Sequence, residues 1–473
     1  MSNAAVAPES TVLDTTFARL REAFQAEPYP EVATRKAKLD ALLANVREQR
    51  EALVKAMSED FGHRSWHESM TYDVLQVVNH IRYAKRNLRG WMAPEPVPLA
   101  WTYQPARAEV LSQPLGVVGV IAPWNFPVQL ALVPIVYAIA AGNRVLLKPS
   151  ELTPATADVL ASLLEQSLGS DWVGVVTGDA EVGAQFASLP FDHLLFTGST
   201  RVGRLVAKAA AENLTPVTLE LGGKSPALVH PDFPTERAAE LVAFGKLANS
   251  GQICVAPDYV LVRKDQASAL VTALQTAMSD MYPKFLENRD YTAIITDRHR
   301  ARLQELLDDA EQKGAQVLRV NPGNEELEGN GKFVPAIVRG VTNEMRVMQE
   351  EIFGPVLPIV ETESYEAMAE VVNQGERPLA MYILDKNEAR ISELMKQTHA
   401  GGIAVNETLI TAGIESLPFG GVGKSGMGSY HGREGFDTFS HRKSIFRQSR
   451  FNLRNLVSPP FGRTLERLLD WLI

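Results

Sequence analysis

The sequence predicts an α/β protein whose core is a parallel β-sheet covered by helices on both faces. Short apolar runs recur along both halves of the chain, and they are continuous rather than alternating, which is typical of strands buried on both faces. Segments with helical periodicity separate these runs, and strands that alternate with helices build parallel sheets. Turns containing glycine or proline follow several runs, as in PWNFP and KPSE.

The first half supplies these elements in order. Apolar residues in segment 31–57 recur at spacings of three, four and seven, which predicts one amphipathic helical face. A strand at 117–122 is followed by a turn at 124–127 and by a helix that runs to Ala141, with Gly142 as its end. Further strands are predicted at 144–147, 173–178, 193–198 and 216–221.

The second half repeats the pattern, with no fixed-period repeat and no low-complexity linker between the halves. Strands are predicted at 259–264, 315–320, 356–361, 380–385 and 402–407. The last 24 residues, from Arg450, end in the amphipathic segment LERLLDWLI. This segment could pack on a partner subunit or touch a membrane surface, and packing is the better expectation.

Length and composition exclude several classes of protein. A chain of 473 residues with 45% hydrophobic and 22% charged residues is typical of two or three globular domains. A formal net charge of −9 argues against nucleic acid as a partner. The apolar stretch from Val128 to Gly142 is too short to span a bilayer, the single cysteine cannot form an intrachain disulfide, and no signal peptide is recognisable. We therefore expect a cytoplasmic protein.

Three motifs are weaker than they first look. Gly-Lys-Ser occurs at 223–225 and 423–425, but a phosphate loop needs a glycine where Thr218 and Pro418 stand. Gly421, Gly423 and Gly426 match the dinucleotide fingerprint without its strand and helix. His63 and His67 lack a third ligand at a supporting spacing, so no metal site is predicted.

Three residues carry potential chemistry. Cys254, in SGQICVAPDY, is either a buried structural thiol or a nucleophile. Glu220 ends a predicted strand before Gly222 and Gly223, and it is either a salt-bridged strand end or a group that faces a ligand. Asn125 follows the strand 117–122, at the sheet edge where parallel sheets bind ligands, although such an Asn often only satisfies backbone groups.

Two further segments follow strands and could hold a nucleotide. Gly198 and Gly203 bracket GSTRVG, which opens a helix whose backbone N–H groups could receive a pyrophosphate. Lys148 and Glu151, in KPSE, could bracket a ribose by hydrogen bonds to its hydroxyl groups.

Taken together, these segments resemble the aldehyde dehydrogenase family. The motifs PWNFP (123–127), KPSE (148–151), FTGST (196–200), LELGGKSP (219–226), GQICVAPDY (251–259), EEIFGPV (350–356) and LPFGG (417–421) match that family in its order. The resemblance covers residues 15 to 445. The APDY after Cys254 and the C-terminal extension are most similar to the class-three branch, and within it to bacterial coniferyl aldehyde dehydrogenases.

The resemblance implies a role for each residue. Cys254 is then the nucleophile, Glu220 the general base, and Asn125 an oxyanion donor together with the backbone N–H of Cys254. The cofactor would be NAD, with NADP possible, and Glu151 should disfavour the 2′-phosphate of NADP. The implied cofactor residues are Gly198, Ser199 and Gly203 at the pyrophosphate, Lys148, Ser150 and Glu151 at the adenine ribose, Glu351 and Phe353 at the nicotinamide ribose, and Trp124 and Leu221 beside them.

The resemblance also implies architecture and reaction. A Rossmann-like nucleotide-binding domain would span 1–97 and 115–220, an α/β catalytic domain 221–436, and a small bridging β-hairpin with the C-terminal extension 98–114 and 437–473. A homodimer is implied. The reaction would oxidise an aromatic aldehyde such as coniferyl aldehyde, or a medium- or long-chain aliphatic one, to its acid through a thiohemiacetal and a thioester on cysteine. The alternatives are a semialdehyde-specific or coenzyme-A-acylating enzyme of the same fold, or a non-catalytic structural homologue.

Overall fold

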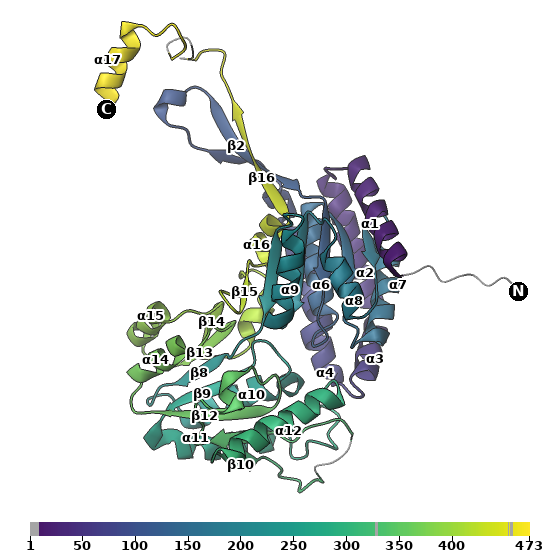
Figure 1. Cartoon of the computed structure of the whole chain (residues 1–473), viewed down its shortest axis with the longest axis vertical. Helices are drawn as coiled ribbons and strands as arrows, with labels where there is room; N and C mark the ends of the chain where they lie inside the picture. The colour runs from purple at the N-terminus through teal and green to yellow at the C-terminus, as the bar shows by residue number, and fades with distance from the viewer. Residues whose placement is uncertain (1–8, 327–329, 453, 455–456) are drawn as a thin grey trace, which may run out of the picture.

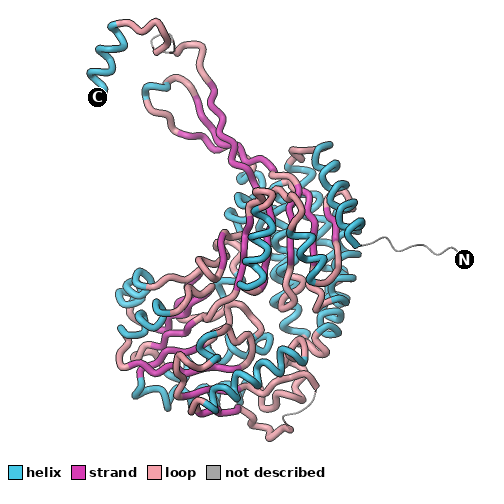
Figure 2. Tube along the Cα trace, in the orientation of Figure 1, coloured by secondary structure: helices cyan, strands magenta, loops and turns pink. Residues whose placement is uncertain are grey.

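The computed structural model describes residues 9–326, 330–452, 454 and 457–473, and it contains two large sheets and a projecting arm (Figures 1 and 2). The first sheet has six strands, and all neighbours in it are parallel except β15, which is antiparallel to β7. In spatial order these strands are β15 (Gly426–Met427), β7 (Val217–Leu221), β6 (His193–Gly198), β3 (Val117–Ile121), β4 (Arg144–Lys148) and β5 (Val173–Val175).

Helices cover both faces of this first sheet, as the continuously apolar strands predict. Val118 and Val120 of β3 face the core shared with α6 and α7, whereas Val117 faces the core shared with α1, α8 and α9. The helices of this half are α1 (Glu9–Ala26), α2 (Val32–Glu48), α3 (Arg50–Asp60), α4 (Trp66–Glu68), α5 (Leu75–Trp91), α6 (Gln129–Ala141), α7 (Pro154–Leu168), α8 (Ala180–Ala187) and α9 (Thr200–Ala211). Gly142 ends α6 with φ 97°, as predicted.

The second sheet has seven strands, and its neighbours are parallel except for the antiparallel pair β10–β11. In spatial order they are β10 (Gln316–Arg319), β11 (Ala336–Arg339), β12 (Val356–Thr362), β9 (Tyr259–Arg263), β8 (Pro226–Val229), β13 (Ala380–Leu384) and β14 (Gly402–Val405). The helices around it are α10 (Thr235–Leu247), α11 (Ala267–Met281), α12 (Asp297–Gln312), α13 (Arg346–Gln349), α14 (Glu366–Gln374) and α15 (Glu388–Gln397).

A three-stranded antiparallel sheet forms the arm, which extends away from both large sheets (Figure 1). Its strands are β1 (Glu95–Val97), β2 (Arg107–Pro114) and β16 (Ser440–Arg447), and the last follows α16 (Gly432–Thr438). The C-terminal helix α17 (Arg463–Leu472) lies near the end of the arm, where the Trp471 ring contacts the Trp101 ring at 6.3 Å. None of the helices in the described part of the chain is long and apolar enough to cross a bilayer.

The fold class is confirmed, with two corrections in detail. Segment 31–57 forms two helices that meet at Gln49. Both helices bury their apolar face in the same core, so the apolar spacing continues across Gln49 and looks like a single helical face in the sequence. Strands β8 and β11, each four residues long, were not predicted.

Candidate active site

The loop that carries Cys254 has an unusual backbone held by many hydrogen bonds. Three consecutive residues before it have positive φ angles of 47°, 52° and 73°, a costly conformation for the first two: Asn249, Ser250 and Gly251. The Glu68 carboxylate accepts from the Asn249 backbone N–H at 2.8 Å, and Gln252 Nε2 donates to the carbonyl oxygens of Asn249 and Ala293 at 3.0 Å. These contacts fix the position of Cys254, which is half-buried.

Asn125 is tied directly to this loop. It is buried in the turn that follows β3, and its Nδ2 donates to the carbonyl oxygen of Gln252 at 3.2 Å. Its own carbonyl oxygen accepts from Asn249 Nδ2 at 3.2 Å. An amide NH2 group has two donors, and the bond to Gln252 uses one of them. Asn125 and Cys254 line the same cavity, so the second donor is available to a group bound at the thiol.

Glu220 is an unpaired carboxyl group beside the thiol. It lies in β7, is 1% exposed, and neither oxygen has a hydrogen-bond partner in the described part of the chain. Burial raises the pKa of Glu220 to about 8, and the nearby Cys254 thiol and Thr197 hydroxyl offset this only in part. A carboxyl group of this kind can accept a proton near neutral pH, which is the property that a general base needs.

The surroundings of the Cys254 thiol favour its neutral form. Burial raises its pKa well above the usual value, and the charges of Glu220 and Glu351 raise it further. Only a thiolate is a good nucleophile, so reaction at this sulfur requires a base to take its proton. Glu220 lies beside the sulfur, but its charge also raises the pKa of the thiol, so it need not be the group that takes this proton.

Glu351 brings a second buried carboxyl group to the same site. Its carboxylate lies where any side chain at Gly222 would overlap it, so the glycine makes this approach possible. Burial and the charge of Asp258 raise the pKa of Glu351 to about 8. Phe353, two residues on, has φ 52° and packs edge-on against the Trp124 ring at 5.4 Å. Oε1 of Glu351 has no hydrogen-bond partner among the described residues.

An ion pair holds the loop that carries Glu351. Lys224 pairs with Asp258, and Lys224 Nζ also donates to the carbonyl oxygens of Val347 at 2.6 Å and Glu350 at 3.1 Å. Asp258 Oδ1 accepts from the backbone N–H of Ile352 at 2.9 Å. Lys224 therefore holds the backbone before Glu351, and Asp258 holds the backbone after it. Lys224 is the lysine of the first Gly-Lys-Ser sequence.

Two cavities meet at Cys254. The larger, of about 700 Å³, is mixed in character and is lined by residues that include Trp124, Asn125, Gly198, Ser199, Glu220, Leu221, Cys254, Glu351 and Phe353. The smaller, of about 260 Å³, is mainly apolar and is lined by residues that include Tyr72, Phe126, Phe244, Ile253, Cys254, Phe419 and Tyr430. Cys254 and Leu130 line both, so the thiol is accessible from either cavity.

The larger cavity also lies where a helix begins. Helix α9 starts directly after β6, and its N-cap Ser199 accepts a hydrogen bond from the Val202 backbone N–H at 3.4 Å. The first N–H groups of a helix attract anions, so this end of the cavity suits a phosphate.

The structure brings nine of the thirteen predicted site residues together in this cavity, and four lie outside its lining: Lys148, Ser150, Glu151 and Gly203. Lys148 and Glu151 form an ion pair at 3.5 Å at the carboxyl end of β4, next to β3. Gly203 lies inside α9, where a Cβ atom would come within 2.7 Å of Leu221, so this glycine allows α9 to pack closely on β7. Its position is explained by packing as well as by ligand binding.

Sequence reasoning missed several residues that line the larger cavity. Arg298, His299 and Arg302 reach it from the beginning of α12, and Arg201 reaches it from α9. Their spacing is typical of an exposed helix face, so no pattern in the sequence indicates that they line a cavity. The apolar cavity was also missed, because its lining comes from several separate segments of the chain.

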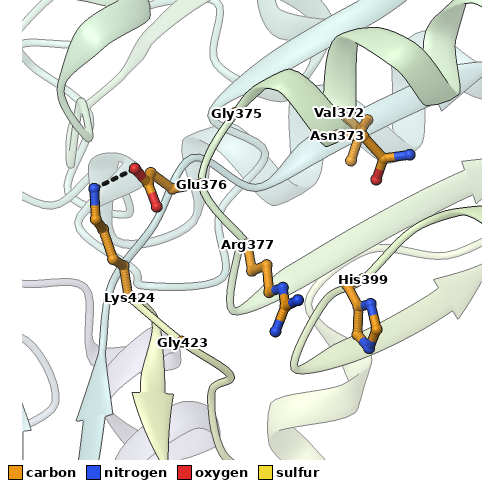
Figure 3. Close-up of a pocket in the computed structure, with 8 residues that line it drawn as sticks. All are labelled: Val372, Asn373, Gly375, Glu376, Arg377, His399, Gly423 and Lys424. Atoms are coloured by element: carbon orange, nitrogen blue, oxygen red, sulfur yellow. Dashed lines mark hydrogen bonds and ion pairs between the residues drawn. The ribbon is translucent and has the colours of Figure 1, made fainter.

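A third hollow lies away from the thiol (Figure 3). Lys424, from the second Gly-Lys-Ser sequence, forms an ion pair there with Glu376, and Arg377 and His399 complete the polar lining. This hollow contains none of the predicted site residues. Lys424 also lines a further cavity together with Lys224 and Glu351, so the two Gly-Lys-Ser sequences face a common hollow. Each is followed by a strand, β8 or β15, rather than by the helix that a phosphate loop needs.

Comparison with known proteins agrees with this geometry. The model of the aldehyde dehydrogenase family matches residues 7–445. The probable coniferyl aldehyde dehydrogenase of Pseudomonas aeruginosa is 45% identical, covering 98% of this chain and 96% of its own. A dimeric NADP-preferring aldehyde dehydrogenase of Rattus norvegicus is 39% identical, covering 94% and 96%. The substrate-bound structure of AldH from Staphylococcus aureus superposes with a TM-score of 0.92 at 33% identity, covering 98% and 99%.

Proposed function

Because the chain belongs to the aldehyde dehydrogenase family, we propose that it oxidises an aldehyde to the carboxylic acid with NAD(P)+, through a thioester on Cys254. The observation that carries this proposal is the position of the thiol, where a mixed cavity and an apolar cavity meet. Glu220 and Asn125 lie at the same junction. A cofactor and an aldehyde can therefore approach one sulfur from two directions.

The larger cavity fits a dinucleotide. The start of α9 at Gly198 and Ser199 suits the pyrophosphate, and the unpaired Oε1 of Glu351 suits a ribose hydroxyl. Trp124, Leu221 and Phe353 would pack beside the nicotinamide, and Lys148, Ser150, Glu151 and Gly203 would hold the adenine end or the helix behind it. When bound, NAD(P)+ supplies the hydride acceptor.

The protein's own residues perform the remaining steps. The Cys254 thiol loses its proton, and the thiolate adds to the aldehyde carbon to give a thiohemiacetal oxyanion. Asn125 Nδ2 and the Cys254 backbone N–H donate hydrogen bonds to that oxygen as its charge develops. After oxidation the acyl group is a thioester on sulfur, and Glu220 takes a proton from the water that hydrolyses it. The acid leaves, and the thiol is restored.

Glu220 also separates this proposal from acyl transfer to coenzyme A. Acyl transfer needs a thiol acceptor rather than an activated water, and a buried carboxyl group with a pKa of about 8 favours water activation. Purified protein should therefore yield NAD(P)H and free acid from an aldehyde, followed at 340 nm and by chromatography of the product. Acyl-CoA as the main product would contradict the proposal, and so would the absence of NAD(P)H with every aldehyde in a panel of aromatic, short aliphatic and long-chain compounds.

The substrate is proposed to be an aromatic aldehyde. The name of the Pseudomonas aeruginosa relative gives coniferyl aldehyde, and five aromatic rings line the apolar cavity of this chain: Tyr72, Phe126, Phe244, Phe419 and Tyr430. Medium- or long-chain aliphatic aldehydes are the second candidate, because they fit an apolar lining equally well.

NAD is proposed over NADP. The carboxylate of Glu151 lies at the carboxyl end of β4, where it would repel a 2′-phosphate, although Lys148 at 3.5 Å offsets part of its charge. We expect a higher kcat/KM for NAD than for NADP, and Glu151→Gln should narrow the difference. Equal or higher kcat/KM for NADP in the unmodified protein would show that Glu151 does not face the ribose.

We also propose three structural units and a homodimer. Five of the six strands of the first sheet suit a nucleotide-binding domain of residues 1–97 and 115–220, of which 1–8 lie outside the described residues, whereas the sixth strand, β15, comes from segment 221–436. The seven-stranded sheet suits a catalytic domain of 221–436, and the arm with its C-terminal extension, 98–114 and 437–473, suits the subunit contact. Sedimentation equilibrium should give twice the mass of one chain, and a monomer would contradict the dimer.

A further inference from the structure

The apolar cavity has an inner and an outer end. Its inner end is at Cys254 and Leu130, which it shares with the larger cavity. Its outer end is at Phe244 and Ile410, whose side chains are 43% and 48% exposed. An aldehyde that reacts at the sulfur must therefore extend the rest of its structure toward the outer residues.

Two buried polar atoms that line this cavity have no hydrogen-bond partner among the described residues: the hydroxyl of Tyr430 and Oε1 of Gln76. Tyr430 lies near the inner end, because the charges of Glu220 and Cys254 both raise its pKa. Gln76 lines only the apolar cavity, beside the outer segment that contains Ile410 and Gly413. A buried acceptor without a donor is costly, so a partner supplied by a ligand would be bound favourably.

The amide of Gln76 is held weakly, so it can turn its buried oxygen toward the cavity. Its Nε2 makes one long contact to the Thr71 carbonyl oxygen at 3.5 Å, which holds the amide only weakly. Gly413 lies opposite, and a Cβ atom there would sit 3.6 Å from Nε2, so the glycine keeps the space before the amide open. Glu407 also lines the cavity, but its Oε1 already accepts from the Thr408 backbone N–H at 2.9 Å. Oε2 of Glu407 remains a second acceptor in the cavity, whereas Gln76 differs in that its oxygen is buried and has no partner among the described residues.

We propose that Gln76 Oε1 accepts a hydrogen bond from a hydroxyl group on the ring of an aromatic aldehyde, and that this contact selects ring-hydroxylated aldehydes over unsubstituted ones. The inference rests on the proposed function and adds a residue that determines specificity. The ring would lie among the aromatic side chains between the two ends, with its aldehyde group at Cys254. A substrate that lacks the hydroxyl leaves the buried oxygen unpaired, and sites of this kind discriminate strongly against such analogues.

The test compares 4-hydroxycinnamaldehyde with cinnamaldehyde, which differ only in the ring hydroxyl. In the unmodified protein we expect kcat/KM to be about tenfold higher for the hydroxylated compound. Gln76→Leu should remove this preference by lowering kcat/KM for 4-hydroxycinnamaldehyde, while the value for cinnamaldehyde stays within about threefold. The unchanged cinnamaldehyde value is the control for folding and for the reactivity of Cys254.

Other outcomes separate this inference from the proposed function. If the unmodified protein oxidises both compounds with equal kcat/KM, or if Gln76→Leu keeps the preference, the role of Gln76 is wrong and the oxidation stands. Loss of the preference in Glu407→Leu but not in Gln76→Leu would assign the hydroxyl to Glu407 and overturn the inference. If no aldehyde is oxidised, the proposed function itself fails. The comparison in the unmodified protein keeps the test decisive even if Gln76→Leu does not fold.

Discussion

The two cavities that meet at Cys254 are built in different ways. The larger one is formed mainly by turns at strand ends and loop segments, and it holds two buried carboxyl groups: Glu220, whose oxygens have no hydrogen-bond partner among the described residues, and Glu351, whose Oε1 has none. The smaller one is formed mainly by aromatic and aliphatic side chains from helices and late loops. The first arrangement carries buried titratable groups that suit chemistry and cofactor binding, and the second supplies shape and burial for a substrate. Cys254 lines both cavities, so a group bound in either one can reach its sulfur.

The largest effect on activity should come from removing the sulfur that both cavities share. Cys254→Ala should lose essentially all aldehyde oxidation, because the sequence holds no second cysteine. Binding of NAD should be retained, because the larger cavity keeps its other lining residues. Turnover by NADH formation at 340 nm and cofactor binding by calorimetry measure the two effects separately. Turnover within tenfold of the unmodified protein would exclude Cys254 as the nucleophile.

The same difference explains what could be predicted from the sequence. Asn125, Gly198 and Glu220 follow or end buried strands, and the order of strands in a parallel sheet brings such positions to one edge, whereas Cys254 lies in the loop that precedes β9. The motifs around them are local, so they can be read along the chain.

The apolar cavity could not be predicted in this way. Gln76 is in one α-helix, Phe244 is in another, and Gly413 ends a short 3-10 helix, and only tertiary packing brings them together. An isolated glutamine on a helix has no pattern that distinguishes a solvated side chain from one that lines a cavity. The same holds for Arg298 and Arg302 at the beginning of α12.

A smaller effect should follow when the loop of Glu351 is released. Lys224→Met removes the donor to the Val347 and Glu350 carbonyl oxygens and leaves Asp258 without its partner. We expect KM for NAD to rise by about tenfold, on the scale of one lost charge-assisted hydrogen bond, with a smaller change in KM for the aldehyde.

Lys424→Met is the matched control, because Lys424 lies in the second Gly-Lys-Ser sequence and lines the same cavity as Lys224 and Glu351, but its amine pairs with the exposed Glu376 rather than with the loop of Glu351. It should leave both KM values within about twofold. Equal effects of the two substitutions would show that Lys224 does not position the cofactor site specifically.

The smallest predicted effect concerns stability and pH. The pKa of Glu351 is raised to about 8 in the folded protein from an ordinary value of 4.5, so the folded state holds a proton that the unfolded state releases between these values. Folding stability contributed by this site therefore falls as the pH rises from about 4.5 to about 8. Glu351→Gln cannot ionise, so its melting temperature should exceed that of the unmodified protein by a margin that grows between pH 5.5 and pH 8.5. A margin that does not change with pH would mean that Glu351 is ionised and stabilised in the folded site.

In the proposed mechanism, Cys254 forms a covalent intermediate that Glu220 helps to hydrolyse. Rapid mixing of Glu220→Gln with NAD and an aldehyde tests both roles in one experiment. We predict a burst of one NADH per active site, an acyl adduct on Cys254 in the intact-mass spectrum, and a steady rate at least about 100-fold below that of the unmodified protein. A slower burst that recovers as the pH approaches about 8.5 would show that Glu220 also deprotonates the thiol. An unchanged burst followed by an unchanged steady rate, with no acyl adduct, would contradict the account and leave Glu220 as an ordinary buried carboxyl group at the end of β7.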